Sequence, residues 1–295
     1  MPYWFRLMLS RSVNHIFLFL LFVLNLCSCQ TEPERSGSGL TIGTSLPVLG
    51  AIIDELIQED DKVFVLLSGS GSPHNFQPRP SDILNLEKSN IVILADPDLD
   101  GWAVDLESAD VHFLSDSLDN QLILFSSGYR NPHFWMDPVL IMNLVHPVAE
   151  LLCQKRKLAC ATYRRRARKF AESLVALDNE IATAVSALHN RSVITSHPFF
   201  DYFLARYNVR VITTLASIPG HEPSPARIVE ILESAKKKNL LGLVAQAGLP
   251  DAAVVVIGQE TDLPIVYINP VGTVGQTYAE FIRLASQTLL GLGNI

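Results

Sequence analysis

Three of the eight histidines stand in a common sequence context. His74 follows a predicted strand, His133 precedes a predicted helix, and His197 ends a predicted strand that Pro198 closes. α/β proteins place their ligands at such strand ends. Neutral imidazole is a good ligand for zinc, copper or iron. We therefore expect these histidines to share one metal site, whose binding weakens as the pH falls through about 6.5, the usual imidazole pKa.

The other histidines lack this context. One lies in the N-terminal apolar segment, and the rest are interpreted as surface or hydrogen-bonded polar residues. A single histidine is more often structural than metal-binding, so the matched surroundings of the first three favour a shared site. The five are His15, His112, His146, His189 and His221.

Short apolar strands alternate with helical segments along the chain. This alternation predicts an α/β fold with mostly parallel sheets covered by helices. The order of elements repeats, which indicates two similar lobes. The expected strands are 40–45, 62–67, 90–95, 192–196, 210–215, 240–245 and 264–268. The expected helices are 82–88 with Ser81 as its cap, 138–152 with Asp137 as its cap, 198–207, 225–238 and 277–292.

A long helical stretch without glycine or proline separates the two series of strands. Residues 162–189 carry apolar side chains at steps of three and four, which is one helical stripe. At ~1.5 Å per residue this helix would span ~40 Å, enough to run along both lobes. The predicted organisation is an N-terminal lobe at 40–160, a linking helix at 161–190 and a C-terminal lobe at 191–295, with the metal cleft between the lobes.

The N-terminus has the pattern of a bacterial lipoprotein signal. Arg6 and Arg11 precede an apolar run at 16–26, which is too short to span a bilayer. The sequence Leu-Cys-Ser-Cys follows and ends at Cys29. We expect a signal peptide at 1–28, a lipid anchor on Cys29, a flexible tether at 29–39 and an extracytoplasmic protein, in the periplasm or on the cell surface. A plain signal peptide cut nearby is the alternative.

Composition and cysteine usage narrow the class of protein further. The formal net charge of −7 and the absence of a concentrated basic face argue against nucleic-acid binding. Cys153 and Cys160 remain in the mature chain. In an oxidising compartment they form either a disulfide across a turn between helices or two buried free thiols.

Long motifs around the three histidines resemble the zinc- and manganese-uptake lipoproteins of ABC importers, the cluster A-I metal-binding family. Residues 73–82 follow the family pattern P-H-x-x-x-P-x-P-S-D, and residues 131–138 follow D-P-H-x-W-x-D-P with Asn131 in place of Asp. Residues 197–203 resemble the family's third ligand segment, a histidine before an aromatic-rich helix, and residues 222–224 its E-P-S helix start. The resemblance implies two α/β lobes joined by one long helix.

Two further departures concern the fourth ligand and the metal. The family commonly has a carboxylate in a D-P-L-G segment, where this chain has Asn269, and often a Glu at the end of the preceding strand, where Gln246 stands. The fourth ligand is then Asn269 through its carbonyl oxygen, a water, or nothing. The long histidine-rich loop of many zinc members is also missing, because residues 115–127 contain no histidine.

The resulting hypothesis is a monomeric, non-enzymatic protein that captures zinc and delivers it to an ABC import permease. Neutral nitrogen ligands favour zinc over manganese. A manganese- or iron-binding member of the same family is the alternative. Rival classes are a zinc metallohydrolase and a binder of siderophore or cobalamin. Asp137 and Asp201 lie four residues after His133 and His197, and we interpret them as a helix cap and a helix-face residue.

Overall fold

The computed structural model describes residues 39–67, 73–106, 109–124, 130–216, 223–236, 240–248 and 252–293. The predicted signal peptide and Cys29 lie outside these ranges, as do His221 and Glu222. Within the described ranges, no helix is both long and apolar enough to cross a bilayer.

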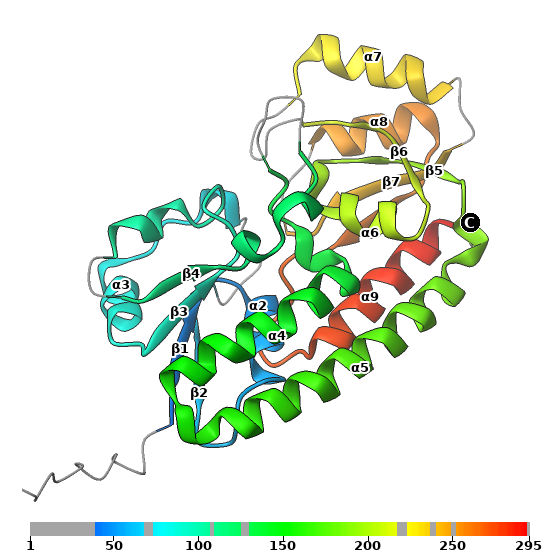
Figure 1. Ribbon diagram of the computed structural model, residues 1–295. Coiled ribbons are helices and arrows are strands. Elements are labelled where there is room, and N and C mark those ends of the chain that lie inside the picture. The colour runs from blue at the N-terminus through cyan, green and yellow to red at the C-terminus, as the bar shows by residue number, and fades with distance from the viewer. Residues whose placement is uncertain are drawn as a thin grey trace, which may run out of the picture. The chain divides into compact units, whose positions relative to one another are not determined.

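The N-terminal half contains a sheet of four parallel strands in the order β2-β1-β3-β4 (Figure 1). Three of the strands were predicted within two residues at either end. The fourth, β4, was not predicted because it has only three, partly exposed residues and therefore no readable alternation. The strands are β1 (Thr41–Thr44), β2 (Lys62–Val65), β3 (Ile91–Leu94) and β4 (Val111–Phe113).

The C-terminal half repeats this arrangement. Its four parallel strands pair in the order β6-β5-β7-β8, so the first strand again lies between the second and the third. Two sheets of the same connectivity confirm the predicted α/β fold of two similar lobes. The strands are β5 (Ser192–Thr195), β6 (Arg210–Thr214), β7 (Leu240–Gln246) and β8 (Ile265–Ile268).

The helices depart from the prediction in several places, and the predicted helix 198–207 is a 3-10 turn at Pro198–Phe200 followed by a shorter helix. α2 was missed because it is buried on almost every side and shows little polar periodicity. α8 was missed because its run of valines is typical of a strand. α3 starts at Pro80, and Arg79, not Ser81, occupies the cap position. The helices are α2 (Pro47–Asp54), α3 (Pro80–Glu87), α4 (Pro138–Lys155), α5 (Cys160–Ala184), α6 (Asp201–Arg206), α7 (Pro225–Lys236), α8 (Ala252–Thr261) and α9 (Tyr278–Leu290).

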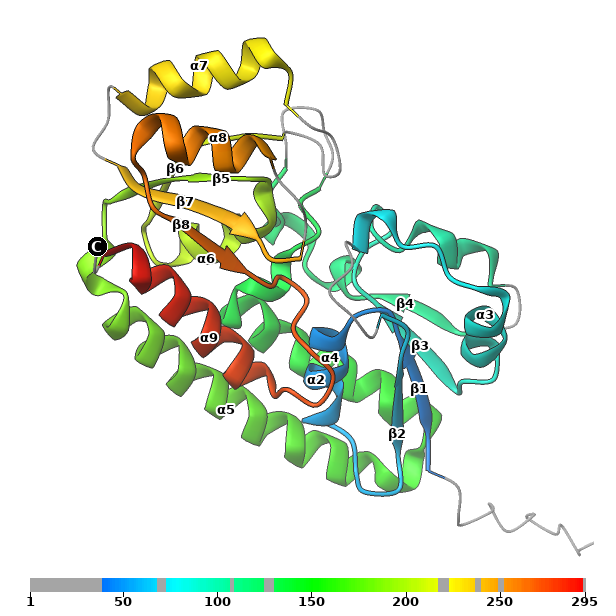
Figure 2. The ribbon, with the colours of Figure 1, turned by 180° about the vertical axis from the view of Figure 1, so that it is seen from behind.

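One continuous hydrophobic core joins the two halves. Ile42 and Ile93 from the first sheet and Val193 and Val244 from the second belong to the same buried cluster, together with side chains of α2, α4, α5, α6 and α9. Each sheet has a separate small core on its other face. Figure 2 shows α7 and α8 covering that face of the C-terminal sheet.

The linking helix α5 is half of a hairpin with α4. Its buried stripe includes Phe170, Leu174 and Leu177, and it packs against α4 and α9. The helix ends at Ala184, earlier than predicted, because a 3-10 turn at Ser186–Leu188 follows it. Its 25 residues correspond to ~37 Å.

A disulfide and a buried carboxylate fasten the turn of this hairpin. Cys153 and Cys160 are joined, with Cα atoms 4.6 Å apart. Asp61, next to β2, accepts hydrogen bonds from Arg156 at 2.9 Å and from the Tyr163 hydroxyl at 2.8 Å. The hairpin is thereby held against the N-terminal sheet.

Candidate metal centre

The structure brings the three predicted histidines together from separate segments. His74 lies in the 3-10 turn Pro73–Asn75, between β2 and α3. His133 immediately precedes the 3-10 turn Phe134–Met136 that leads into α4. His197 follows β5 with an extended backbone. Two of the three histidines therefore come from the N-terminal half and one from the C-terminal half.

The distances among the histidines suit a metal ion. One nitrogen from each ring lies within 4.8 Å of the others. Among the described residues, no other group of three or more His, Cys, Asp or Glu side chains is close enough together to hold an ion. His74 Nε2 and His133 Nε2 are 3.1 Å apart. Nitrogens bound tetrahedrally at ~2.05 Å from zinc are ~3.3 Å apart, so small movements would complete three bonds.

Asn131 determines which nitrogen of His133 is free. Its Oδ1 lies 2.7 Å from His133 Nδ1, and an amide oxygen can only accept, so Nδ1 carries the proton. The lone pair of His133 is then on Nε2, facing the other rings, and His74 Nε2–H donates to it. For His74 Nε2 to take a metal, its proton would have to move to Nδ1, a change of tautomer without a change of charge.

His197 has an unused ligand atom. Its Nε2 is buried and has no hydrogen-bond partner, while Nδ1 is 3.5 Å from the Ser196 hydroxyl. A buried polar atom without a partner is costly and requires an explanation. A bound cation would give this nitrogen a partner. The three imidazole nitrogens therefore fit a metal of the zinc type.

Burial keeps the three imidazoles neutral. Desolvation lowers the pKa of His74 to about 4 and that of His197 to about 3. The pKa of His133 is also lowered well below its usual value by burial and by the two neighbouring rings. The expected loss of binding near pH 6.5 is therefore wrong for this site, because protons compete only at lower pH.

Aromatic rings enclose the site. The Trp135 ring centroid is 5.3 Å from that of His133, and the Phe199 centroid is 4.9 Å from that of His197. Both aromatic side chains are fully buried. An apolar surround of this kind excludes water, which accounts for the lowered pKa values.

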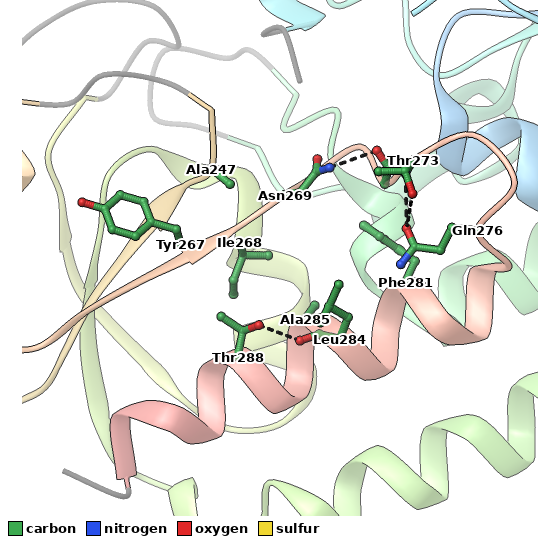
Figure 3. Close-up of a pocket in the computed structure, with 11 residues that line it drawn as sticks. Ala247, Tyr267, Ile268, Asn269, Thr273, Gln276, Phe281, Leu284, Ala285 and Thr288 are labelled. Atoms are coloured by element: carbon green, nitrogen blue, oxygen red, sulfur yellow. Dashed lines mark hydrogen bonds between the residues drawn. The ribbon is translucent and has the colours of Figure 1, made fainter. Parts of the chain in front are cut away.

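Asn269, predicted as a fourth ligand, uses both amide atoms within its own loop. Its Oδ1 accepts from Val271 N and its Nδ2 donates to the Gly272 carbonyl, each at 3.0 Å. It also lines a cavity of about 250 Å³ between β8 and α9 (Figure 3), and none of the lining residues is a histidine. To coordinate a metal, Asn269 would have to use the second lone pair of Oδ1 or give up the hydrogen bond that Oδ1 accepts from Val271 N.

Gln246 offers another oxygen. It ends β7, which lies between β5 and β8, and its buried Oε1 has no partner. Val193 and Val244 face the shared core, so alternation places His197 and Gln246 on that same face. The sequence identified Gln246 only as a departure from the family pattern, and its burial could not be foreseen.

The nearby carboxylates and the other histidines have different positions. Asp137 accepts a hydrogen bond from Val139 N and caps α4, as expected. Asp201 begins α6, and burial raises the pKa of its carboxyl to about 6. His112 pairs with Asp110 at 3.1 Å, and the largely exposed His146 lies on α4 near Glu150. None of them belongs to the histidine cluster.

Comparison with known proteins identifies the family. The model of the family "zinc-uptake complex component A, periplasmic" matches residues 42–291. The chain belongs to this family. The resemblance found in the sequence motifs is thus confirmed, and so is the non-enzymatic class, since the family consists of substrate-binding proteins of ABC transporters.

Named relatives of the family are distant in sequence. The manganese-binding lipoprotein MntA of Halalkalibacterium halodurans is 22% identical, over 92% of this chain and 96% of its own length. The zinc-binding lipoprotein AdcA of Streptococcus pneumoniae is 21% identical over 85% of this chain, which spans 53% of that protein. A crystal structure of ZnuA superposes with a TM-score of 0.78 at 18% identity, covering 86% of this chain and 99% of the other, and supports the fold.

Proposed function

We propose that this protein binds zinc outside the cytoplasm through His74, His133 and His197 and delivers it to an ABC import permease. The observation that carries the proposal is the cluster of three neutral imidazoles, two buried and that of His74 partly buried, whose ligand atoms lie within 4.8 Å of one another. Family membership supports the permease partner.

The choice of zinc follows from the donor set. Neutral nitrogens suit zinc, whereas manganese prefers carboxylate and water oxygens in an octahedron. In the described ranges no carboxylate joins the cluster. Relatives include both zinc- and manganese-binding proteins, so manganese or iron is the second candidate cargo.

A fourth ligand, where the ion takes one, would be a neutral oxygen. Asn269 is the residue suggested by the family pattern, and Gln246 is the residue whose buried oxygen lacks a partner. Either leaves the ligand set uncharged, so both are consistent with zinc.

Elemental analysis of protein purified without chelator tests the cargo. Single replacements of His74, His133 or His197 by Ala should each lower zinc affinity by orders of magnitude while the metal-free fold persists. His112→Ala and His146→Ala are matched controls, because both side chains lie outside the cluster. If either control loses as much affinity as the three, the ligand assignment is wrong.

We further propose that the chain acts as a monomer held at the membrane by a lipid on Cys29. The support is the Leu-Cys-Ser-Cys sequence after a short apolar run and the lipoprotein names of relatives. Mass spectrometry of the mature N-terminus decides the anchor. An unmodified N-terminus elsewhere in the chain would exclude it.

A further inference from the structure

Asn131 is a fully buried residue with hydrogen bonds to both halves of the protein. Its Oδ1 accepts from His133 Nδ1 at 2.7 Å and from His133 N at 3.1 Å. Its Nδ2 donates to the carbonyl of Pro198 at 2.7 Å. Its own carbonyl accepts from the Tyr202 hydroxyl at 2.7 Å. Both ends of the side-chain amide are therefore used.

These partners belong to the two segments that carry the ligands. His133 comes from the N-terminal half, and Pro198 directly follows His197 in the C-terminal half. One planar amide thus fixes the tautomer of the first ligand and the main chain beside the second. We propose that Asn131 is a positioning residue that bridges the two ligand segments in the metal-free protein and slows release of the ion. This inference rests on the proposed function.

A carboxylate could not make this bridge. Aspartate would still accept from the imidazole, but it has no N–H to donate. It would instead direct an oxygen at the Pro198 carbonyl oxygen from a fully buried position. The family pattern has Asp here, so the bridge follows from the departure in this chain.

A second connection would keep an Asn131 variant folded. Trp135 donates through Nε1 to the Pro270 carbonyl at 2.7 Å, and the Tyr278 hydroxyl donates to the Trp135 carbonyl at 2.9 Å. These bonds tie the same segment to the C-terminal half independently of Asn131. Loss of the bridge should therefore loosen residues 197–203 without unfolding the protein.

The test compares Asn131→Asp with Asn131→Ala and with Asn143→Asp. Asn143 also donates from Nδ2 at 2.7 Å, to the Gln121 side chain, but it is exposed on α4 and makes no bond to the described residues of either ligand segment, so it controls for the chemical change. Hydrogen exchange of the metal-free full chain, read by mass spectrometry, reports the opening of residues 197–203. Stopped-flow transfer of zinc to a chelator reports its release.

Both Asn131 variants should exchange about tenfold faster at 197–203 than wild type, which corresponds to ~1.4 kcal/mol, and both should release zinc faster. Asn131→Asp keeps the bond to His133 and loses only the bond to Pro198. If Asn131 merely orients His133, the exchange rate at 197–203 in Asn131→Asp should equal that in the control Asn143→Asp. That result, or an unchanged release rate, would overturn the inference. Hydrogen exchange is measured on metal-free protein, so this test of the bridge remains valid even if wild type binds no zinc and the proposed function fails.

Discussion

Zinc binding at pH 6 should release almost no protons. At that pH an ordinary imidazole with a pKa of 6.5 is about three-quarters protonated, so three such ligands would release roughly two protons. In this site the pKa of His74 is lowered to about 4 and that of His197 to about 3, and that of His133 is also well below 6.5. His74 is then protonated at the level of about 1% and His197 at less, and burial keeps His133 neutral as well.

The same shifts set the pH dependence of affinity. Between pH 7.5 and 5.5, three ordinary imidazoles would lose roughly a thousandfold in zinc affinity. Here the affinity should change by no more than about twofold over that range and fall only as the pH approaches about 4, where His74 takes up its proton.

Isothermal titration calorimetry at pH 6, in two buffers of different ionisation enthalpy, counts the released protons. His112→Ala is the control and should give the wild-type count, because His112 lies outside the cluster. A release of about two protons would refute the reasoning, since it would mean that the metal-free histidines are solvated and charged.

Acid should also destabilise the metal-free protein. Between pH 6.5 and about 4 the unfolded chain binds protons at His74 that the folded chain does not, so stability falls as the pH falls. With a folded-state pKa of about 4 against 6.5 in the unfolded chain, this one group should cost about 2 kcal/mol between pH 7 and pH 5. Denaturation of metal-free protein at pH 7 and pH 5 measures the change, and equal stability would contradict the burial of His74.

Three further outcomes are expected. Tyr278→Phe removes the donor to the buried Trp135 carbonyl and should cost about 1–2 kcal/mol in the free energy of unfolding, measured with urea. Asn269→Asp should narrow the preference for zinc over manganese in competition titrations by adding a charged oxygen; an unchanged ratio would place residue 269 outside the site. Counting thiols in denatured, non-reduced protein should find Cys153 and Cys160 unreactive, and two reactive thiols would exclude their disulfide.

Local sequence was sufficient for the strands and the candidate ligands. Seven of the eight strands lie within or close to the predicted ranges, because short apolar runs mark strands that are buried in a sheet. The three histidines were found because each lies at the end of a strand or the start of a helix. Such positions are marked by nearby prolines, which is information carried within a few residues.

Other features depend on contacts between distant residues. The depressed pKa values come from burial among Trp135 and Phe199, and the tautomer of His133 comes from Asn131, whose other partner is 67 residues away. α2 and α8 are hidden for the same reason, because tertiary packing makes helices of segments whose local pattern does not indicate one.

The continuous core has a consequence for dividing this chain. Although each half has its own sheet, Val193 and Val244 of the second half pack in the same cluster as Ile42 and Ile93 of the first. A gene cut within α5 would therefore give two fragments that each expose a large apolar face, and these would aggregate unless expressed together. The two halves resemble each other in strand order, yet neither should fold alone. Replacing one half with the corresponding half of a relative would also disturb the shared core.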